Sequence, residues 1–558
     1  MKADLLLLHA PSSWSFRERT PSWGPISGVI PSTPVFEMYP MGFVSIAEYL
    51  HRHGYKVDIA NIALRMLDHP KTNVERLISS MKAKLFGIDL HWMVHANGSI
   101  ELARLCKKIH PQTKIVFGGL SSTFFADELI QEDAVDFVIK GDSAELPILR
   151  LLQELEKTKP NYSNVPNLVY RDQTIVDNGI SYVPETLDDF TLDYKYIVKM
   201  LTSVRGLKLR FPYRDYMKHP LLALFTIKGC TNNCILCGGS KYFYKTYCKR
   251  TKPAFRSAEQ IIRDLLAIES YVKLPVFFVS DIQQAGADYW KEIFSKIKSE
   301  RIDLPFAFEL FSPAPKEFFE QLSGLTASVQ ISPDSWSEKT RELNRKPSYS
   351  NAALEKNITY ALDVGVEKFD IYYMIGLIGQ TQQEFKDTLS YMDQNLATFG
   401  EKLHYFIAPM APFLDPGSIA YDNPEKYGIT KFCSSVKDHY QALTNRSWKN
   451  LLSYESTLSR EEIVQYTYDT VDRLFDIKVI HGHLSQKEYT IQKELLRRSK
   501  ESYQRLERDE SQNNVSINDV APNLDAPTLT TNKELYFGDY SILSLRSVLR
   551  LIRRKLFR

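Results

Sequence analysis

Three of the six cysteines in the chain fall within one short stretch, where Cys230, Cys234 and Cys237 have the spacing Cys-x3-Cys-x2-Cys. Six cysteines among 558 residues are too few for a disulfide framework, so clustered thiols indicate metal or redox chemistry in a reducing compartment. Three thiolates on one loop can hold three irons of a [4Fe–4S] cubane. Electron-transfer clusters use four cysteines. A missing fourth ligand therefore indicates an iron reserved for a substrate or cofactor, and we predict one such cluster with these three ligands.

Glycines flank this loop at positions 229, 238 and 239, and they would let the backbone approach inorganic sulfur closely. The alternatives are a zinc site or unrelated thiols. Zinc usually draws on a second cysteine pair or a Cys/His set, and the sequence shows no such second half. The remaining cysteines are scattered, so we expect buried small hydrophobes rather than a second cluster; they are Cys106, Cys248 and Cys433.

The elements that must position the cysteines read as alternating strands and helices. Six apolar strand patterns are separated by helical stretches, and the cysteine loop follows the first of them; they span residues 221–227, 275–281, 305–311, 327–332, 368–376 and 403–409. Six strands with intervening helices favour a (β/α)6 partial TIM barrel rather than a complete one of eight. We assign it to residues 220–420.

The N-terminal residues 1–155 also alternate short strands and helices. This pattern predicts a doubly wound, Rossmann-like parallel sheet, so the whole chain is α/β. Ligands of such sheets bind beyond the carboxyl ends of the strands. The other expected segments are a linker with a small hairpin, a helical C-terminal region, a flexible linker and a basic amphipathic helix; they span residues 156–219, 421–505, 506–531 and 532–558.

Composition is that of an ordinary globular protein, with 25% charged and 44% apolar residues and a net charge of +3. No apolar run approaches the ~18–20 residues that span a bilayer, so we expect a cytoplasmic protein. The final helix combines an apolar face with six cations: Arg546, Arg550, Arg553, Arg554, Lys555 and Arg558. Peripheral contact with the inner face of the membrane and docking on the barrel both fit this pattern. No RNA-binding module is visible, and nucleic acid is not an expected partner.

The cysteine spacing at the end of the first strand of a (β/α)6 barrel resembles the signature of the radical S-adenosylmethionine (SAM) superfamily. The resemblance implies that the open iron chelates the amino and carboxylate groups of SAM. One electron, from a reduced donor of the flavodoxin or ferredoxin type, then cleaves SAM to methionine and a 5′-deoxyadenosyl radical. The resemblance identifies no side chain of this protein as catalytic.

Later strand ends resemble the SAM-contacting segments of the same superfamily across residues 220–410. The stretch "FFVSDIQQAG" holds Asp281 where the family has Gly-Gly-Glu, and "YYMIGLIGQTQQEF" resembles the fifth-strand segment with Ile378 in place of Pro. The resemblance therefore implies a set of SAM-binding positions, although each alone could be an ordinary polar residue or glycine; they are Asp281, Glu309, Ser332, Asp334, Ser335, Arg345 and Gly376.

The N-terminal part resembles the cobalamin-binding domain of the B12-dependent radical SAM class. The resemblance rests on three segments: residues 39–59, "IVFGGLSSTF" and "VDFVIKGDSAELPILRLL". The resemblance implies that Gly118, Gly119 and Gly141 line the cobalamin tail; ordinary tight turns are the alternative. The Asp-x-His-x-x-Gly loop that donates a histidine to cobalt in many B12 proteins is absent, and a domain that has lost cobalamin stays open.

The combination predicts a radical SAM enzyme with a [4Fe–4S] cluster, SAM and cobalamin. We expect methyl transfer or carbon–carbon bond formation at an unactivated carbon of a small-molecule or lipid substrate. One alternative is a cobalamin-independent cyclisation or rearrangement. Another is a non-catalytic iron–sulfur sensor or scaffold.

Overall fold

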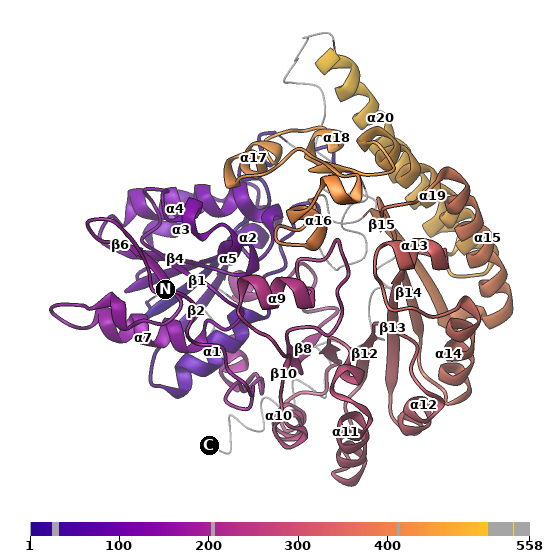
Figure 1. Cartoon of the computed structure of the whole chain (residues 1–558), viewed down its shortest axis with the longest axis horizontal. Helices are drawn as coiled ribbons and strands as arrows, with labels where there is room; N and C mark the ends of the chain where they lie inside the picture. Colours follow the sequence, from indigo (N-terminus) through magenta and orange to yellow (C-terminus); the bar gives the residue numbers. More distant parts are fainter. Residues whose placement is uncertain are drawn as a thin grey trace.

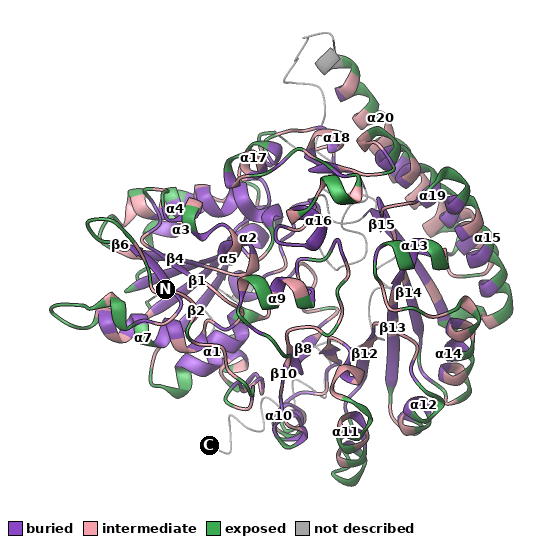
Figure 2. Ribbon diagram, in the orientation of Figure 1, coloured by how far each residue is buried: buried purple, intermediate pink, exposed green. Residues whose placement is uncertain are grey.

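The computed structural model describes residues 2–19, 21–24, 33–201, 207–409, 413–511 and 540. It contains two α/β units, one built on the N-terminal sheet and one on the second sheet, with the C-terminal elements running over both (Figure 1). In Figure 2 the strands of both sheets are buried and the outer helix faces are exposed. The predicted basic C-terminal helix lies outside the described residues except for Tyr540.

The N-terminal sheet has seven strands in the order β2-β1-β3-β4-β5-β6-β7. The first five in this order are parallel, which confirms the predicted doubly wound sheet. The bounds are β1 Leu5–His9, β2 Val57–Asn61, β3 Leu85–Asp89, β4 Lys114–Gly118, β5 Phe137–Ile139, β6 Leu168–Arg171 and β7 Ile175–Asp177. The order reverses between β1 and β3, and ligands of open α/β sheets bind at such a switch point.

Helices cover both faces of this sheet, which is why its first strand "LLLLH" is apolar and buried along its whole length. Helix α1 (Gly42–Arg52) packs beside α7 (Glu145–Leu155), and α3 (Val74–Ser79) packs beside α4 (Ala96–Ile109). The shorter helices of this unit are α2 Ile62–Asp68, α5 Leu120–Phe124, α6 Ala126–Leu129 and α8 Lys195–Leu201.

The small hairpin expected in a linker is instead part of the sheet. Strand β6 pairs antiparallel with β5, and β7 pairs antiparallel with β6. The buried residues Leu168 and Val169 extend the apolar face of the sheet, which explains why this segment is attached to it.

The second sheet has six parallel strands in the order β15-β14-β13-β12-β11-β8. This confirms the predicted partial barrel. The strands are β8 Leu222–Phe225, β11 Val276–Val279, β12 Phe306–Leu310, β13 Ala327–Asp334, β14 Phe369–Ile375 and β15 Leu403–Pro409. Its helices are α9 Lys241–Tyr247, α10 Ala258–Glu269, α11 Ala287–Ser299, α12 Lys316–Leu322, α13 Glu338–Leu343, α14 Asn351–Asp363 and α15 Gln382–Phe399.

The C-terminal region is helical, as predicted, and carries one two-stranded sheet of β16 (Thr430–Lys431) and β17 (Tyr454–Glu455). Its helices are α16 Ile419–Asp422, α17 Val436–Ala442, α18 Trp448–Leu451, α19 Arg460–Ile480 and α20 Gln486–Ser511. Helix α20 therefore occupies the first residues of the expected flexible linker. In this stretch Glu507 forms an ion pair with Lys449 of α18, which holds the end of the helix against the C-terminal region. In the described part of the chain, no helix has the length and apolar character needed to cross a membrane.

Candidate active site

The three clustered cysteines lie on one loop that follows β9 (Ile227–Lys228) and leads into α9. The side chains of Cys230 and Cys234 are half-buried, and Cys237 is exposed. Partial burial raises the pKa of both half-buried thiols. The neighbouring Cys234 raises the pKa of Cys230 further. The backbone N–H groups of Asn232 and Gly239 donate to the sulfurs of Cys230 and Cys237 at 3.4 and 3.3 Å. Such N–H···S contacts also surround iron–sulfur clusters and tune their potential.

Two neighbouring turns of the barrel hold this loop in place. The N–H of Thr231 donates to the side-chain carbonyl of Gln284, after β11, at 2.8 Å. The N–H of Ile235 donates to the carbonyl of Asn344 at 3.1 Å, and the Asn344 amide donates to the carbonyl of Ile378, after β14, at 2.9 Å. The cysteine loop is therefore tied to the carboxyl ends of two other barrel strands.

A buried ion pair lies beside the cysteines. The ammonium of Lys346 is 2.8 Å from Oδ2 of Asp334, and both side chains are largely buried. Lys346 also opposes the rise in the pKa of the Cys234 thiol, so its charge acts on that sulfur. The other carboxylate oxygen of Asp334, Oδ1, is buried and has no hydrogen-bond partner. Asp334 has a positive φ of 67°, at the bulge that ends β13, so its carboxylate is held in place by an unusual backbone turn.

The structure places Arg345 away from this pair. Arg345 is exposed, with a φ of 52° that turns the chain after α13. Its neighbour Lys346 is the cation next to the cysteines. The structure therefore adds Lys346 as a charged residue beside the cysteines, and a role of Arg345 in SAM binding stays a prediction.

Two of the predicted carboxylates lie together at the ends of β11 and β12. Oε2 of Glu309 accepts from the N–H of Ser280 at 2.7 Å, and burial raises the pKa of Glu309 to about 7. Asp281 begins the turn after β11, and its carboxylate accepts from the N–H groups of Gln283 and Phe311 at 2.9 and 2.8 Å. Burial raises the pKa of Asp281 to about 6. Asp281 thus fixes the turn. At Glu309, the charge of Lys346 opposes the rise in pKa.

Two of the remaining predicted residues of the barrel, Ser335 and Gly376, have local structural partners. Ser332 is half-buried on β13. The Ser335 hydroxyl donates to Glu384 and accepts from the N–H of Ser337, so it fixes the start of α13. Gly376 has a φ of 102°, and its carbonyl accepts from the Tyr454 hydroxyl at 2.9 Å. A Cβ there would lie 2.5 Å from that hydroxyl, so glycine is required for packing.

Asp415 is a residue that the sequence analysis did not single out. Its Oδ2 accepts from the N–H of Gly238 at 2.9 Å, and burial raises its pKa to about 6. A Cβ on Gly238 would lie 2.8 Å from the Asp415 side chain, which explains the glycine. Asp415 comes from the segment after β15, so only the fold could bring it to the cysteine loop.

A cavity of about 330 Å³ lies between the N-terminal sheet and the start of the barrel. Residues of β1, β3, β4 and β5, with the N-termini of α1 and α7, line one side. The barrel contributes Phe225, Ile227, Lys228, Tyr244 and Val279. The segment that supplies Lys228 and Tyr244 also carries the three cysteines.

The glycines predicted at the carboxyl edge of the sheet all line this cavity. A Cβ on Gly118 would meet no atom within 4 Å, so this position faces open space. Gly119 has a φ of 122°, and a Cβ there would lie 2.7 Å from the backbone of His91. Gly141 has a φ of 93° and follows β5. Of the three, Gly118 is the one that leaves room for a ligand.

Two ion pairs hold the cavity walls together. The ammonium of Lys228 lies 3.1 Å from Glu145 at the start of α7, and both side chains are buried or nearly so. Arg250, beyond α9, pairs with Asp142. Both cations belong to the barrel unit and both carboxylates to the N-terminal unit, so these pairs fix the cysteine-bearing segment against the sheet.

Family models match both units of the chain. The model described as B12 binding domain matches residues 29–148, and the model described as Radical SAM superfamily matches residues 224–392. The chain belongs to the radical SAM superfamily, in the class that carries a B12-binding domain. Among proteins with curated descriptions, none matches it.

Solved structures of this class share the fold of the radical SAM chain. The methyltransferase TsrM from Kitasatospora setae, with cobalamin and a [4Fe–4S] cluster bound, is 13% identical, with a TM-score of 0.57 over 85% of this chain and 89% of that one. OxsB, a cobalamin-dependent S-adenosylmethionine radical enzyme with aqua-cobalamin and S-adenosylmethionine bound, is 12% identical, with a TM-score of 0.56 over 99% and 79%. A second TsrM structure, with tryptophan substrate and a SAM analogue, has a TM-score of 0.54 at 14% identity over 78% and 82%.

The residues of this radical SAM chain fit the groups that the class implies. Three thiols on one loop with two N–H···S contacts suit a cubane. The unpartnered Oδ1 of Asp334 leaves an acceptor beside Cys234 for a further polar ligand. The cavity with open space at Gly118 suits a cofactor held between the two units. In the described part, no three His, Cys, Asp or Glu side chains converge closely enough to hold a single metal ion.

Proposed function

We propose that the chain is a cobalamin-dependent radical SAM enzyme that transfers a methyl group, or forms a carbon–carbon bond, at an unactivated carbon. One observation carries the proposal. The segment with the three cysteines also lines, through Lys228 and Tyr244, the cavity at the carboxyl edge of the B12-binding sheet. A radical generated at the cysteine loop and a methyl group held in the cavity would then serve one substrate at the boundary of the two units.

When bound, the cofactors supply the hard chemistry: an electron for SAM cleavage, the 5′-deoxyadenosyl radical for hydrogen abstraction, and a methyl carrier. Cys230, Cys234 and Cys237 would hold the cluster. Lys346 keeps a positive charge beside Cys234, and Asp334 offers its free oxygen to a hydrogen-bond donor of SAM. These residues bind and orient; none of them needs to react.

The N-terminal unit would hold cobalamin in the cavity. Gly118 leaves open space for it, and Gly119 and Gly141 permit the left-handed turns that shape the edge. The pairs Lys228–Glu145 and Arg250–Asp142 would keep cobalamin at a fixed distance from the cluster. Fixed separation matters because two reactive centres must meet one substrate.

We propose a small-molecule substrate, as tryptophan is for TsrM, with a lipid as the second candidate. The electron would come from a reduced flavodoxin- or ferredoxin-type protein. Peripheral membrane contact through residues 532–558 remains a prediction from sequence.

An anaerobic turnover assay tests this function. The reconstituted protein, with cobalamin, SAM and a reductant, should form 5′-deoxyadenosine and methionine and should show the corrin absorption band in stoichiometric amount. Cys106→Ala, which changes a buried cysteine far from the loop in sequence, is the matched control for Cys234→Ala. Loss of product only in Cys234→Ala supports the proposal. Radical formation without bound corrin would point to the cobalamin-independent alternative, and no product from a reconstituted cluster to a sensor or scaffold.

A further inference from the structure

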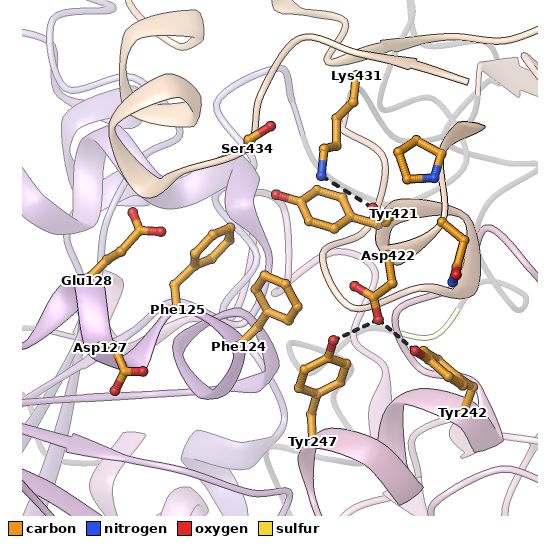
Figure 3. Close-up of a pocket in the computed structure, with 12 residues that line it drawn as sticks. Phe124, Phe125, Asp127, Glu128, Tyr242, Tyr247, Tyr421, Asp422, Lys431 and Ser434 are labelled. Carbon is orange, nitrogen blue, oxygen red and sulfur yellow. Dashed lines mark hydrogen bonds between the residues drawn. The ribbon is translucent and has the colours of Figure 1, made fainter. Parts of the chain in front are cut away.

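A second cavity, of about 650 Å³, is also lined by α9 but shares no lining residue with the cavity at the B12-binding sheet. Three parts of the chain build it. Helices α5 and α6 of the N-terminal unit form one wall, α9 a second, and α16 with β16 the third (Figure 3). None of the predicted site residues lines it.

The walls of this cavity are aromatic. Phe124 lines it, with its ring centroid 4.9 Å from that of Tyr247 and 5.4 Å from that of Tyr421. Phe125 and Tyr242 complete the aromatic lining. Aromatic faces carry negative electrostatic potential and attract cations.

The charged groups of the cavity are mostly acidic. Asp127 and Glu128 come from α6 and Asp422 from α16, whereas Lys431 is the one cation among the described lining residues. The Asp422 carboxylate accepts from the hydroxyls of Tyr242 and Tyr247 at 2.9 and 2.7 Å. It is therefore fixed at the floor of the cavity, between the two phenol groups shown in Figure 3.

An unpartnered polar group points into the same space. Tyr421 is 3% exposed, and its hydroxyl has no hydrogen-bond partner. In Figure 3 its ring extends toward the side of the cavity formed by Phe125 and Ser434. A buried hydroxyl without a partner is costly in a folded protein, so a ligand that supplies one would be bound more tightly.

The cavity already shows how it accommodates an ammonium group. The Lys431 nitrogen lies 3.8 Å from the centroid of the Tyr421 ring and donates to the Tyr421 carbonyl at 3.3 Å. Burial lowers the pKa of Lys431, and the nearby Asp422 opposes this change. Among the described residues, none of the three carboxylates of the cavity forms an ion pair with Lys431.

We infer that this cavity is a binding site for a small organic ammonium ion with an apolar or aromatic body, separate from the radical site. The body would pack on Phe124 and Tyr247. The ammonium would donate to Asp422, and a polar group at the other end of the ligand would partner the Tyr421 hydroxyl. The net negative lining excludes a simple anion as the occupant.

Calorimetric titration of the reconstituted holoenzyme with phenethylammonium tests this inference, with uncharged 2-phenylethanol as the matched probe. We expect phenethylammonium to bind roughly tenfold more tightly than the alcohol, because charge-assisted hydrogen bonds are about twice as strong as neutral ones. The difference should shrink as salt is added, since the walls are partly exposed.

Two variants must change the affinity in opposite directions. Asp422→Asn keeps an acceptor for both tyrosines and should weaken phenethylammonium roughly tenfold, because it removes the fixed charge. Lys431→Gln removes a like charge and should tighten the same probe about threefold or more. Tyr421→Phe keeps the ring and should leave the affinity for this probe within about twofold, because phenethylammonium has no second polar group to partner the hydroxyl. Lys426→Gln, a change of equal charge at an exposed residue outside the lining, should leave affinity within about twofold.

Equal affinity for the two probes would overturn the inference, as would weakening by Lys431→Gln. Near-ultraviolet circular dichroism of each variant separates loss of the site from loss of the fold. Binding is measured without turnover, so intact binding in a protein that forms no 5′-deoxyadenosine would count against the proposed function alone.

Discussion

The ammonium nitrogen of Lys346 lies 2.8 Å from the Asp334 carboxylate, and its charge acts on the Cys234 thiol. This pair joins the end of β13 to the segment after α13, and the same segment accepts a hydrogen bond from the cysteine loop at the Asn344 carbonyl. Both side chains are largely buried, so each stabilises the other in a place where an unpaired charge would be costly.

Removing Lys346 should destabilise the barrel. Lys346→Met leaves the Asp334 charge buried and unpaired, and breaking such a pair costs about 3 kcal/mol or more. Urea unfolding of the cofactor-free protein measures the change in the free energy of unfolding. The exposed Lys339→Met, on the preceding helix α13, should change it by less than about 0.5 kcal/mol. The double variant Lys346→Met/Asp334→Asn should recover part of the loss; a strictly additive result would contradict the coupling.

The charges beside the cysteines should set the cluster potential with opposite signs. At pH 8, above the pKa of about 6 that burial gives Asp415, Asp415→Asn removes a negative charge next to Gly238 and should raise the midpoint potential. Lys346→Met should lower it. Each shift should be on the order of 50 mV, since one charge at a partly buried distance is worth about 1 kcal/mol or more. Redox titration followed by electron paramagnetic resonance measures both, and shifts of the same sign would refute this assignment.

The stability of the protein should fall with rising pH because of Glu309. Burial raises its folded-state pKa from 4.5 to about 7. Between these values the folded protein keeps a proton that the unfolded chain has lost, so the free energy of unfolding decreases as pH rises through this window. Glu309→Gln keeps an acceptor for Ser280 and should be more stable than the wild type at pH 8, by up to about 3 kcal/mol. Denaturant unfolding at pH 5 and pH 8 measures the difference; exposed Glu300→Gln should show none.

Two adjacent glycines of the cavity should behave differently. Gly118→Leu projects a side chain into open space, so the fold should persist while cobalamin affinity falls. Gly119→Ala meets the His91 backbone at 2.7 Å and has a φ of 122°, so it should lower the free energy of unfolding by about 2 kcal/mol. Gly365→Ala, with a φ of 84° and no atom within 4 Å, isolates the cost of backbone strain. Unchanged corrin binding in Gly118→Leu would contradict the placement of cobalamin.

The sheets were predictable because their strands are buried apolar runs separated by helical periodicity. The cysteine loop was predictable because its spacing is local. The addition of β6 and β7 to the sheet was not, since it depends on an open edge at β5. These features show that local patterns define elements, whereas edge pairing depends on the assembled fold.

The surroundings of the cysteines were harder to predict than the cysteines themselves. The positive φ of Arg345 turns that side chain outward and places Lys346 next to the cysteines instead. Asp415 reaches Gly238 from 177 residues away in the chain. Neither relationship has a signal in the local sequence.

The most direct test is spectroscopic, on anaerobically reconstituted protein. The reduced cluster should have four irons and three cysteine ligands, and SAM labelled with ¹⁷O at its carboxylate and ¹⁵N at its amine should produce hyperfine couplings in electron–nuclear double resonance. Serine in place of Cys230, Cys234 or Cys237 should abolish the cluster signal. A reduced cluster whose spectrum is unchanged by SAM, or one that survives all three substitutions, would contradict the account.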